Sequence, residues 1–286
     1  MYKILYCFRE QNRNKGTLKM SVYANRATAS LLNMTKEMYR KGIEISRITK
    51  TCTLLLMSGL SRSDISRGIL ERCLRSQHPD GGFVGNTDTL WNIKLLEFFP
   101  EYQAQREVAI RWLRQGNGPE PGYGRSKRDM HRIPVTGLAL FMIPELADRK
   151  TLEWLESTWL SEKNSLTYKA AYTLLAFHQC MATLPYQPPM LHDTVEWLLS
   201  QQQDNGGFAP WFNHPAGENV YCTAVAMLGI MSDDASPHYD AVTRAYRYLC
   251  TTQLRTGIWP YHEIEDGSSW GLFALAQAEA YLHLEE

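Results

Sequence analysis

The sequence predicts an all-α protein in which repeated helical hairpins close into an α/α barrel. A motif of glutamine, glycine and an aromatic residue recurs along the chain at intervals of roughly 40 to 50 residues, about the length of one helical hairpin. Apolar patterns of helical period flank the motif. The alternation of apolar and polar residues that strands require is nearly absent.

Two copies of the motif are clear, at residues 77–83 (QHPDGGF) and 202–208 (QQDNGGF), and a looser copy lies at 253–259 (QLRTGIW). A weaker copy occupies 115–123, and we expect a degenerate unit near 159–166. Glycine allows a sharp turn between an outer and an inner helix. The glutamine side chain can bond backbone groups left free at a helix end, and the aromatic ring can pack on the next hairpin. These motif residues are therefore expected to be scaffold.

The helices follow in order. The pattern predicts helices at 20–40, 43–58 and 61–75, which open a single barrel domain spanning 20–286. Residues 1–19, an apolar stretch followed by a polar one, are expected to be a peripheral extension. Helices after the motifs, at 90–99, 135–143, 168–177, 221–230 and 270–281, are apolar on more than one face, which is typical of buried helices. Segments 193–203 and 236–250 are amphipathic and fit an outer layer.

Composition excludes several classes of protein. The 30 basic residues balance the 30 acidic ones, so no overall field attracts nucleic acid. A hydrophobic content of 44% argues against a disordered chain. No apolar run is long enough to span a bilayer, which leaves only peripheral membrane contact open. Six scattered cysteines indicate reduced thiols and a cytoplasmic protein.

The repeats resemble those of the terpenoid cyclases and the protein prenyltransferase β-subunits, over roughly residues 60–286. Segment 206–228 (GGFAPWFNHPAGENVYCTAVAML) is similar to the stretch of squalene-hopene-type, class II cyclases that runs from GGF to D-x-D-D-T-A. The family's T-A falls on Thr223 and Ala224. The resemblance implies an α/α barrel and a cyclase, isomerase or lyase. It also implies a hydrophobic isoprenoid or other polyene as substrate, held in a dry, apolar cavity.

The acidic motif of that family is not retained. Its positions fall on Asn219, Val220, Tyr221 and Cys222. In the family the middle aspartate protonates an alkene or epoxide. Asn219 cannot do so, and phenols and thiols are much weaker acids than a carboxylic acid. Glu218, one position earlier, could replace the lost acid if burial raises its pKa, or it could simply favour the helix dipole. A pericyclic cyclisation would need no strong acid.

Other groups could supply the acid. Asp88 lies where a shorter loop would place the family's last D-T, and it is either a helix cap or a polar group in the cavity. Asp266 precedes the last inner helix and is either a cap or a proton donor. His262 lies near two carboxylates and could act as a general acid or base, since its pKa responds to such neighbours.

Several side chains at or after the motifs are candidates for substrate binding. Aromatic faces at the mouth of a barrel could enclose an apolar substrate and stabilise carbocations, or they could pack one hairpin on the next. The candidates are Trp91, Trp211, Phe212, Tyr221, Tyr261 and Trp270, together with Asn219 and Cys222 at the replaced acidic motif.

No metal or cofactor is expected. Where the prenyltransferase branch carries a cysteine ligand to zinc, residues 266–270 read DGSSW. The D-D-x-x-D motif of class I terpene synthases is missing, and the acidic cluster at 233–240 is typical of a solvated loop. Three alternatives stay open: a barrel that binds a hydrophobic ligand without catalysis, a sugar-active barrel with two carboxylates about 5–10 Å apart, and a protein-interaction scaffold with a filled centre.

Overall fold

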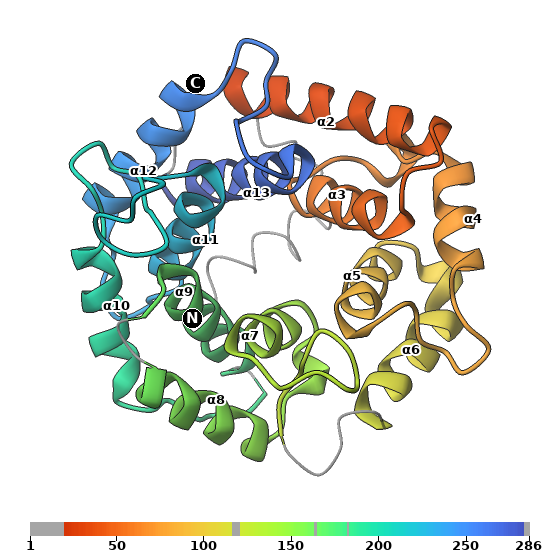
Figure 1. Cartoon of the computed structure of the whole chain (residues 1–286), viewed down its shortest axis with the longest axis horizontal. Helices are drawn as coiled ribbons and strands as arrows, with labels where there is room; N and C mark the ends of the chain where they lie inside the picture. Colours follow the sequence, from red (N-terminus) through yellow and green to blue (C-terminus); the bar gives the residue numbers. More distant parts are fainter. Residues whose placement is uncertain (1–19, 116–120, 163–164, 182, 283–286) are drawn as a thin grey trace.

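The computed structural model describes residues 20–115, 121–162, 165–181 and 183–282, and the described regular elements are all helical. The predicted extension at 1–19 lies outside the described residues. Figure 1 shows an inner ring of helices surrounded by an outer ring, which confirms the predicted all-α barrel. The inner helices are α3 (Ile45–Met57), α5 (Asn86–Glu97), α7 (Ile133–Met142), α9 (Thr167–Cys180), α11 (Val220–Met231) and α13 (Ile264–Tyr281).

The outer helices cover the inner ring and expose one face to solvent. They are α2 (Val22–Arg40), α4 (Arg67–Arg75), α6 (Gln103–Gln115), α8 (Arg149–Glu162), α10 (Met190–Ser200) and α12 (Tyr239–Thr252), with short 3-10 turns at Arg62–Asp64, Pro100–Tyr102 and Pro144–Leu146. Inner helices are buried nearly all round: in α11 every residue except Tyr221 is buried. Buried backbone needs partners, and a helix supplies them within itself.

The predicted boundaries differ most from the structure at two helices, and the helix predicted at 90–99 also begins earlier, at Asn86. The helix predicted at 270–281 begins at Ile264. The apolar pattern missed this start because the first turn of the helix is polar. The helix predicted at 61–75 is divided, since Ser66 caps a helix that begins only at Arg67. The Ser66 hydroxyl accepts the Ile69 N–H, which fixes the new start.

Each glutamine of the three clearer motif copies bonds backbone carbonyls, as predicted, and it also links two hairpins. Its side-chain nitrogen donates to the carbonyl of the glycine four residues later and to a carbonyl of the next outer segment. These bonds join Gln77 to Gly81 (2.9 Å) and Gln105 (3.1 Å), Gln202 to Gly206 (3.0 Å) and Ala241 (2.9 Å), and Gln253 to Gly257 (3.1 Å) and Tyr23 (3.0 Å).

The turn after each glutamine is fixed at two further points. Gly206 has a φ of 87°, in the left-handed region that favours glycine. The backbone N–H of Phe208 then donates to the Thr223 hydroxyl at 2.9 Å. Thr223, which falls on the threonine of the family motif, therefore holds the turn against the inner helix. Equivalent bonds run from Phe83 to Thr89, from Tyr123 to Thr136 and from Trp259 to Ser268.

The ring closes where α13 and α12 meet α2. The buried Glu279 carboxylate accepts the Ser21 backbone N–H at 3.2 Å, the Ser21 hydroxyl, and the Tyr246 hydroxyl at 3.3 Å. Gly257 packs so closely on α2 that a Cβ there would lie 2.5 Å from the Arg26 carbonyl oxygen. The last motif copy therefore closes the barrel onto its first described helix.

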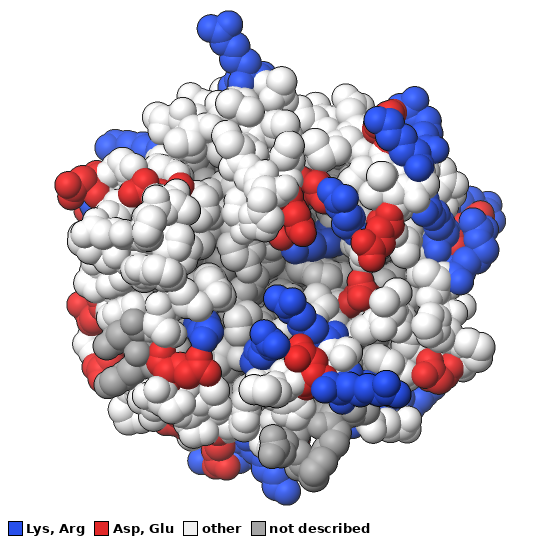
Figure 2. Space-filling model, viewed as in Figure 1, with Lys and Arg blue, Asp and Glu red and all other residues white. Residues whose placement is uncertain are grey.

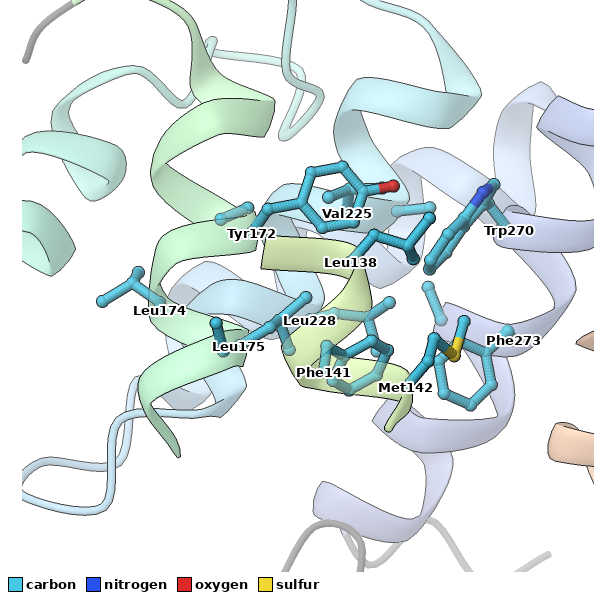
Figure 3. Close-up of a cluster of buried hydrophobic side chains, with 14 of the residues drawn as sticks. Leu138, Phe141, Met142, Tyr172, Leu174, Leu175, Val225, Leu228, Trp270 and Phe273 are labelled. Carbon is cyan, nitrogen blue, oxygen red and sulfur yellow. The ribbon is translucent and has the colours of Figure 1, made fainter. Parts of the chain in front are cut away.

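Side chains from α7, α9, α11 and α13 fill the deep part of the barrel (Figure 3). The void among them measures about 10 Å³, enough for one water molecule. It is lined by Phe141, Leu175, His178, Leu228, Ser232, Phe273 and Gln277. At the other end, where the inner helices begin, the surface is hollowed at its centre and ringed by charges of both signs (Figure 2). We call this end the mouth.

Candidate functional site

Aromatic side chains from neighbouring inner helices meet at the mouth. The Trp270 ring of α13 lies 6.0 Å from the Trp91 ring of α5, 6.0 Å from Tyr172 of α9 and 6.3 Å from Tyr221 of α11, between ring centroids. Tyr261 precedes α13 and stacks on Tyr221 at 5.8 Å. We call these five side chains the aromatic wall. Trp91, Tyr172 and Trp270 are buried, and Tyr221 and Tyr261 are partly exposed. Aromatic rings of this kind suit an apolar ligand or a cation.

The phenols of the aromatic wall stay protonated. The hydroxyl oxygens of Tyr172 and Tyr221 lie 3.0 Å apart and share a hydrogen bond. Burial raises the pKa of both groups far above the ordinary value, and Tyr261 is shifted in the same direction for the same reason. Burial also raises the pKa of the Cys222 thiol to about 11. The groups at the replaced acidic motif are therefore even weaker acids here than in water.

Asp266 lies beside the aromatic wall and forms an ion pair with Lys50 of α3. Only 14% of the Asp266 side chain and 24% of the Lys50 side chain are exposed. The Lys50 ammonium also lies 5.5 Å from the centroid of the Trp91 ring. Asp266 is not the predicted helix cap, since that position belongs to Glu263. The carboxylate is held by a cation instead.

Asp88 occupies a different environment at the same end of the barrel. It lies one turn before Trp91 on the same face of α5. Burial raises the pKa of its carboxyl, and the charge of Glu44 adds to the increase, while Ser46 partly offsets it. Asp88 is not a cap either, because Gly85 takes the cap position. Among the carboxyls of the described residues with a clear pKa shift, Asp88 is the one whose pKa is raised.

Glu218 lies elsewhere. A Cβ at Gly207 would lie 2.9 Å from the Glu218 Cβ and 2.7 Å from the Tyr248 ring, which places Glu218 against the outer helix α12. Trp211 and Phe212 are 43% and 48% exposed, and the Trp211 ring contacts His214 at 4.0 Å.

The remaining predicted residues lie at the start of α11 or α13. Asn219 caps α11 by accepting the Cys222 N–H at 2.9 Å, so its side chain has a structural task. The ring of the exposed His262 lies 4.1 Å from the ring of Tyr261, at the edge of the aromatic wall.

Sequence reasoning missed Lys50 and Tyr172. Neither residue follows a clear motif copy, because α3 and α9 begin without one. Lys50 could have been found as the single charge just before the apolar run TCTLLLM. Tyr172 could have been found as the second of two tyrosines four residues apart at the start of an inner helix, on one face with Tyr168.

Within the described ranges, no group of three or more His, Cys, Asp or Glu side chains could hold a metal ion. No described helix combines the length and apolar character needed to cross a membrane.

The fold and the sequence together define the family. Residues 23–259 match the prenyltransferase alpha-alpha toroid domain, and the chain belongs to that family. In sequence it is similar to protostadienol synthase A of Arthroderma gypseum, with 36% identity over 91 residues. That match covers 29% of this chain and 12% of the synthase.

Solved structures of similar shape share little sequence with this chain. A variant of the type II terpene cyclase MstE from Scytonema, in complex with geranylgeranyl dihydroxybenzoate, is 14% identical with a TM-score of 0.69, covering 91% of this chain and 99% of that one. A protein from Actinoplanes is 12% identical with a TM-score of 0.65, covering 88% and 99%. Likeness at these identities establishes a common fold.

Proposed function

We propose that this protein is a terpene-cyclase-like enzyme that cyclises or isomerises an isoprenoid or other polyene at the aromatic wall. The observation that carries the proposal is the meeting of five aromatic rings at the end of the barrel where Asp88, a carboxyl whose pKa is raised by burial, also lies. A carboxyl with a raised pKa is typical of a general acid. The prenylated ligand named in the MstE complex supports a hydrophobic, prenylated substrate.

In the proposed reaction Asp88 is the proton donor. Its carboxyl gives a proton to an alkene carbon, or to an epoxide oxygen whose carbon–oxygen bond then breaks, and positive charge develops on carbon. A second double bond of the substrate attacks that carbon, and the rings of Trp270, Tyr172 and Tyr221 stabilise the cation. The cyclised cation then loses one proton to water, and the Asp88 carboxylate takes one proton back from water, so the reaction is balanced. Asp266 forms an ion pair with Lys50 and is not the proposed donor.

The substrate is expected to be a hydrophobic small molecule, and the compartment the cytoplasm. The five cysteines that the structure describes are all free thiols, which supports a reducing compartment.

Turnover of prenyl substrates tests the proposal. We expect the purified protein to convert at least one of geranylgeranyl diphosphate, squalene and 2,3-oxidosqualene into a cyclic or isomeric product, measured by gas chromatography with mass spectrometry. Asp88→Asn should lower turnover by about 10²- to 10⁴-fold, because general acid catalysis contributes about that much. Turnover should also fall as the pH rises through the raised pKa of Asp88.

The matched control is Glu218→Gln, which changes a carboxylate near α12 and should retain wild-type turnover. Asp88→Asn with undiminished turnover would show that Asp88 is not the acid.

A barrel that binds a hydrophobic ligand without catalysis is the second candidate. The replacement of all three acids of the family motif, at Asn219, Tyr221 and Cys222, favours it. Binding of these compounds without any product would establish this alternative.

A further inference from the structure

Lys50 is a cation built into the aromatic wall. Its ammonium lies over the Trp91 ring at 5.5 Å and pairs with the Asp266 carboxylate. Trp91 in turn contacts Trp270, which contacts Tyr172 and Tyr221. A carboxylate beside several ring faces is the arrangement that binds organic ammonium ions in proteins. Lys50 occupies the cation position of such a site from within the chain.

Two ion pairs join α3 to α13 near Lys50: Lys50 pairs with Asp266, and Arg47 pairs with Glu265. The carboxylates of Glu44 and Glu263 also act on Arg47. The named groups on this side of the mouth therefore include more carboxylates than cations. Removal of the Lys50 charge alone would leave Asp266 as an uncompensated, mostly buried carboxylate beside the aromatic rings.

We propose that Lys50 determines the charge class of ligand that the mouth accepts, admitting neutral apolar molecules and excluding organic cations. An external ammonium ion cannot displace a tethered one without leaving Lys50 unpaired in a poorly hydrated place. The inference rests on the proposed function in one respect, which is that the ligand binds at the same mouth.

Ligand binding by a Lys50→Met variant tests this inference. The probes are decyltrimethylammonium and 1-decanol, a cation and a neutral molecule with the same alkyl chain, and binding is followed by isothermal titration calorimetry. At pH 8 the variant should bind decyltrimethylammonium about tenfold or more tightly than the wild type does, because it exposes an unpaired carboxylate beside the rings. Binding of 1-decanol should change by less than about threefold.

Two controls separate the charge effect from looser packing. Lys94→Met removes another mostly buried lysine, paired with Glu97 near the opposite end of α5, and should leave both affinities unchanged. The double variant Lys50→Met with Asp266→Asn should return to the wild-type affinity for the ammonium probe.

The inference is overturned if Lys50→Met binds the ammonium probe no more tightly than the wild type. It is also overturned if the double variant keeps the increased affinity. Should Lys50→Met lack a cooperative thermal transition, Lys50→Gln provides the same comparison with a polar side chain of similar length. These measurements need no turnover, so a failure of the proposed enzyme activity would leave their outcome readable.

Discussion

Asp88 and Asp266 show how neighbours decide what a carboxyl can do. Both lie in the first turn of an inner helix at the mouth. Asp266 forms an ion pair with the Lys50 ammonium. Asp88 has no such cation in the described contacts, and its pKa is raised by burial and by the charge of Glu44. Asp88 is therefore better suited to hold a proton than an ordinary aspartate.

This difference makes stability depend on pH through Asp88. A raised pKa means that the folded chain binds the proton more tightly than the unfolded chain. The resulting contribution is complete below the unfolded pKa of about 3.9 and is lost as the pH rises through the folded pKa. Asp88→Asn resembles the protonated form, so at pH 7 it should be more stable than the wild type. The gain should shrink toward pH 4, as measured by urea unfolding.

The control is the exposed Asp204→Asn, which should change the free energy of unfolding by less than about 0.5 kcal/mol at either pH. A gain for Asp88→Asn that is the same at pH 7 and pH 4 would contradict the expected linkage.

The site was predictable only in part, for a physical reason. Trp91, Tyr261 and Trp270 lie within a few residues of a motif copy, so the spacing placed them near the mouth. The partners Lys50 and Tyr172 come close to them only through closure of the ring, which no local pattern describes. Glu218 follows a motif as well, yet its loop directs it to α12.

At the scale of the element, the repeat is a turn locked by side-chain bonds. Gln202 holds two carbonyls and Thr223 holds the Phe208 N–H, so three backbone groups are satisfied where an outer helix meets an inner one. The sequence predicted this role because the residues recur at one spacing. It did not predict the polar first turn of α13, because helix starts are set by caps and dipoles rather than by apolar period.

The close approach within this turn gives a prediction for two glycines. Gly206 and Gly217 both have positive φ, of 87° and 69°. A Cβ at Gly206 would lie 2.3 Å from the Arg244 carbonyl oxygen, whereas a Cβ at Gly217 would meet nothing within 4 Å. Gly217→Ala should therefore cost only the left-handed strain of about 1–2 kcal/mol. Gly206→Ala should cost about 1–3 kcal/mol more, through overpacking.

Chemical denaturation of both variants measures this difference in the free energy of unfolding. Gly217→Ala is the control, because it introduces the backbone strain without the close contact. Equal losses of stability would show that the contact with α12 relaxes freely.

For the whole molecule, the ring and its filling were not equally predictable. Repeats of hairpin length predicted closure, and α13 does pack on α2 and α3. The depth of the hollow could not be predicted, because it depends on how side chains from opposite helices interdigitate. Phe141 and Phe273 approach to 6.5 Å across the interior and fill the deep part, while the mouth stays hollowed.

Closure depends on the buried Glu279 carboxylate. Glu279→Ala should lower the free energy of unfolding by about 2–4 kcal/mol, because it leaves the Ser21 N–H and hydroxyl and the Tyr246 hydroxyl without their acceptor. Thermal or urea unfolding measures the loss. Glu196→Ala, on the exposed face of α10, should change stability by less than about 0.5 kcal/mol. Similar losses in both variants would mean that closure does not rely on Glu279.

The bond between Ser21 and Glu279 has a further consequence. Open solenoids expose their first and last units, which fray and need special capping repeats. In this protein the stack returns to its own beginning, so each hairpin is flanked on both sides and the chain can dispense with caps. Loss of the bonds between Ser21 and Glu279 would open the ring, and the first and last hairpins would then each pack against a neighbour on one side only.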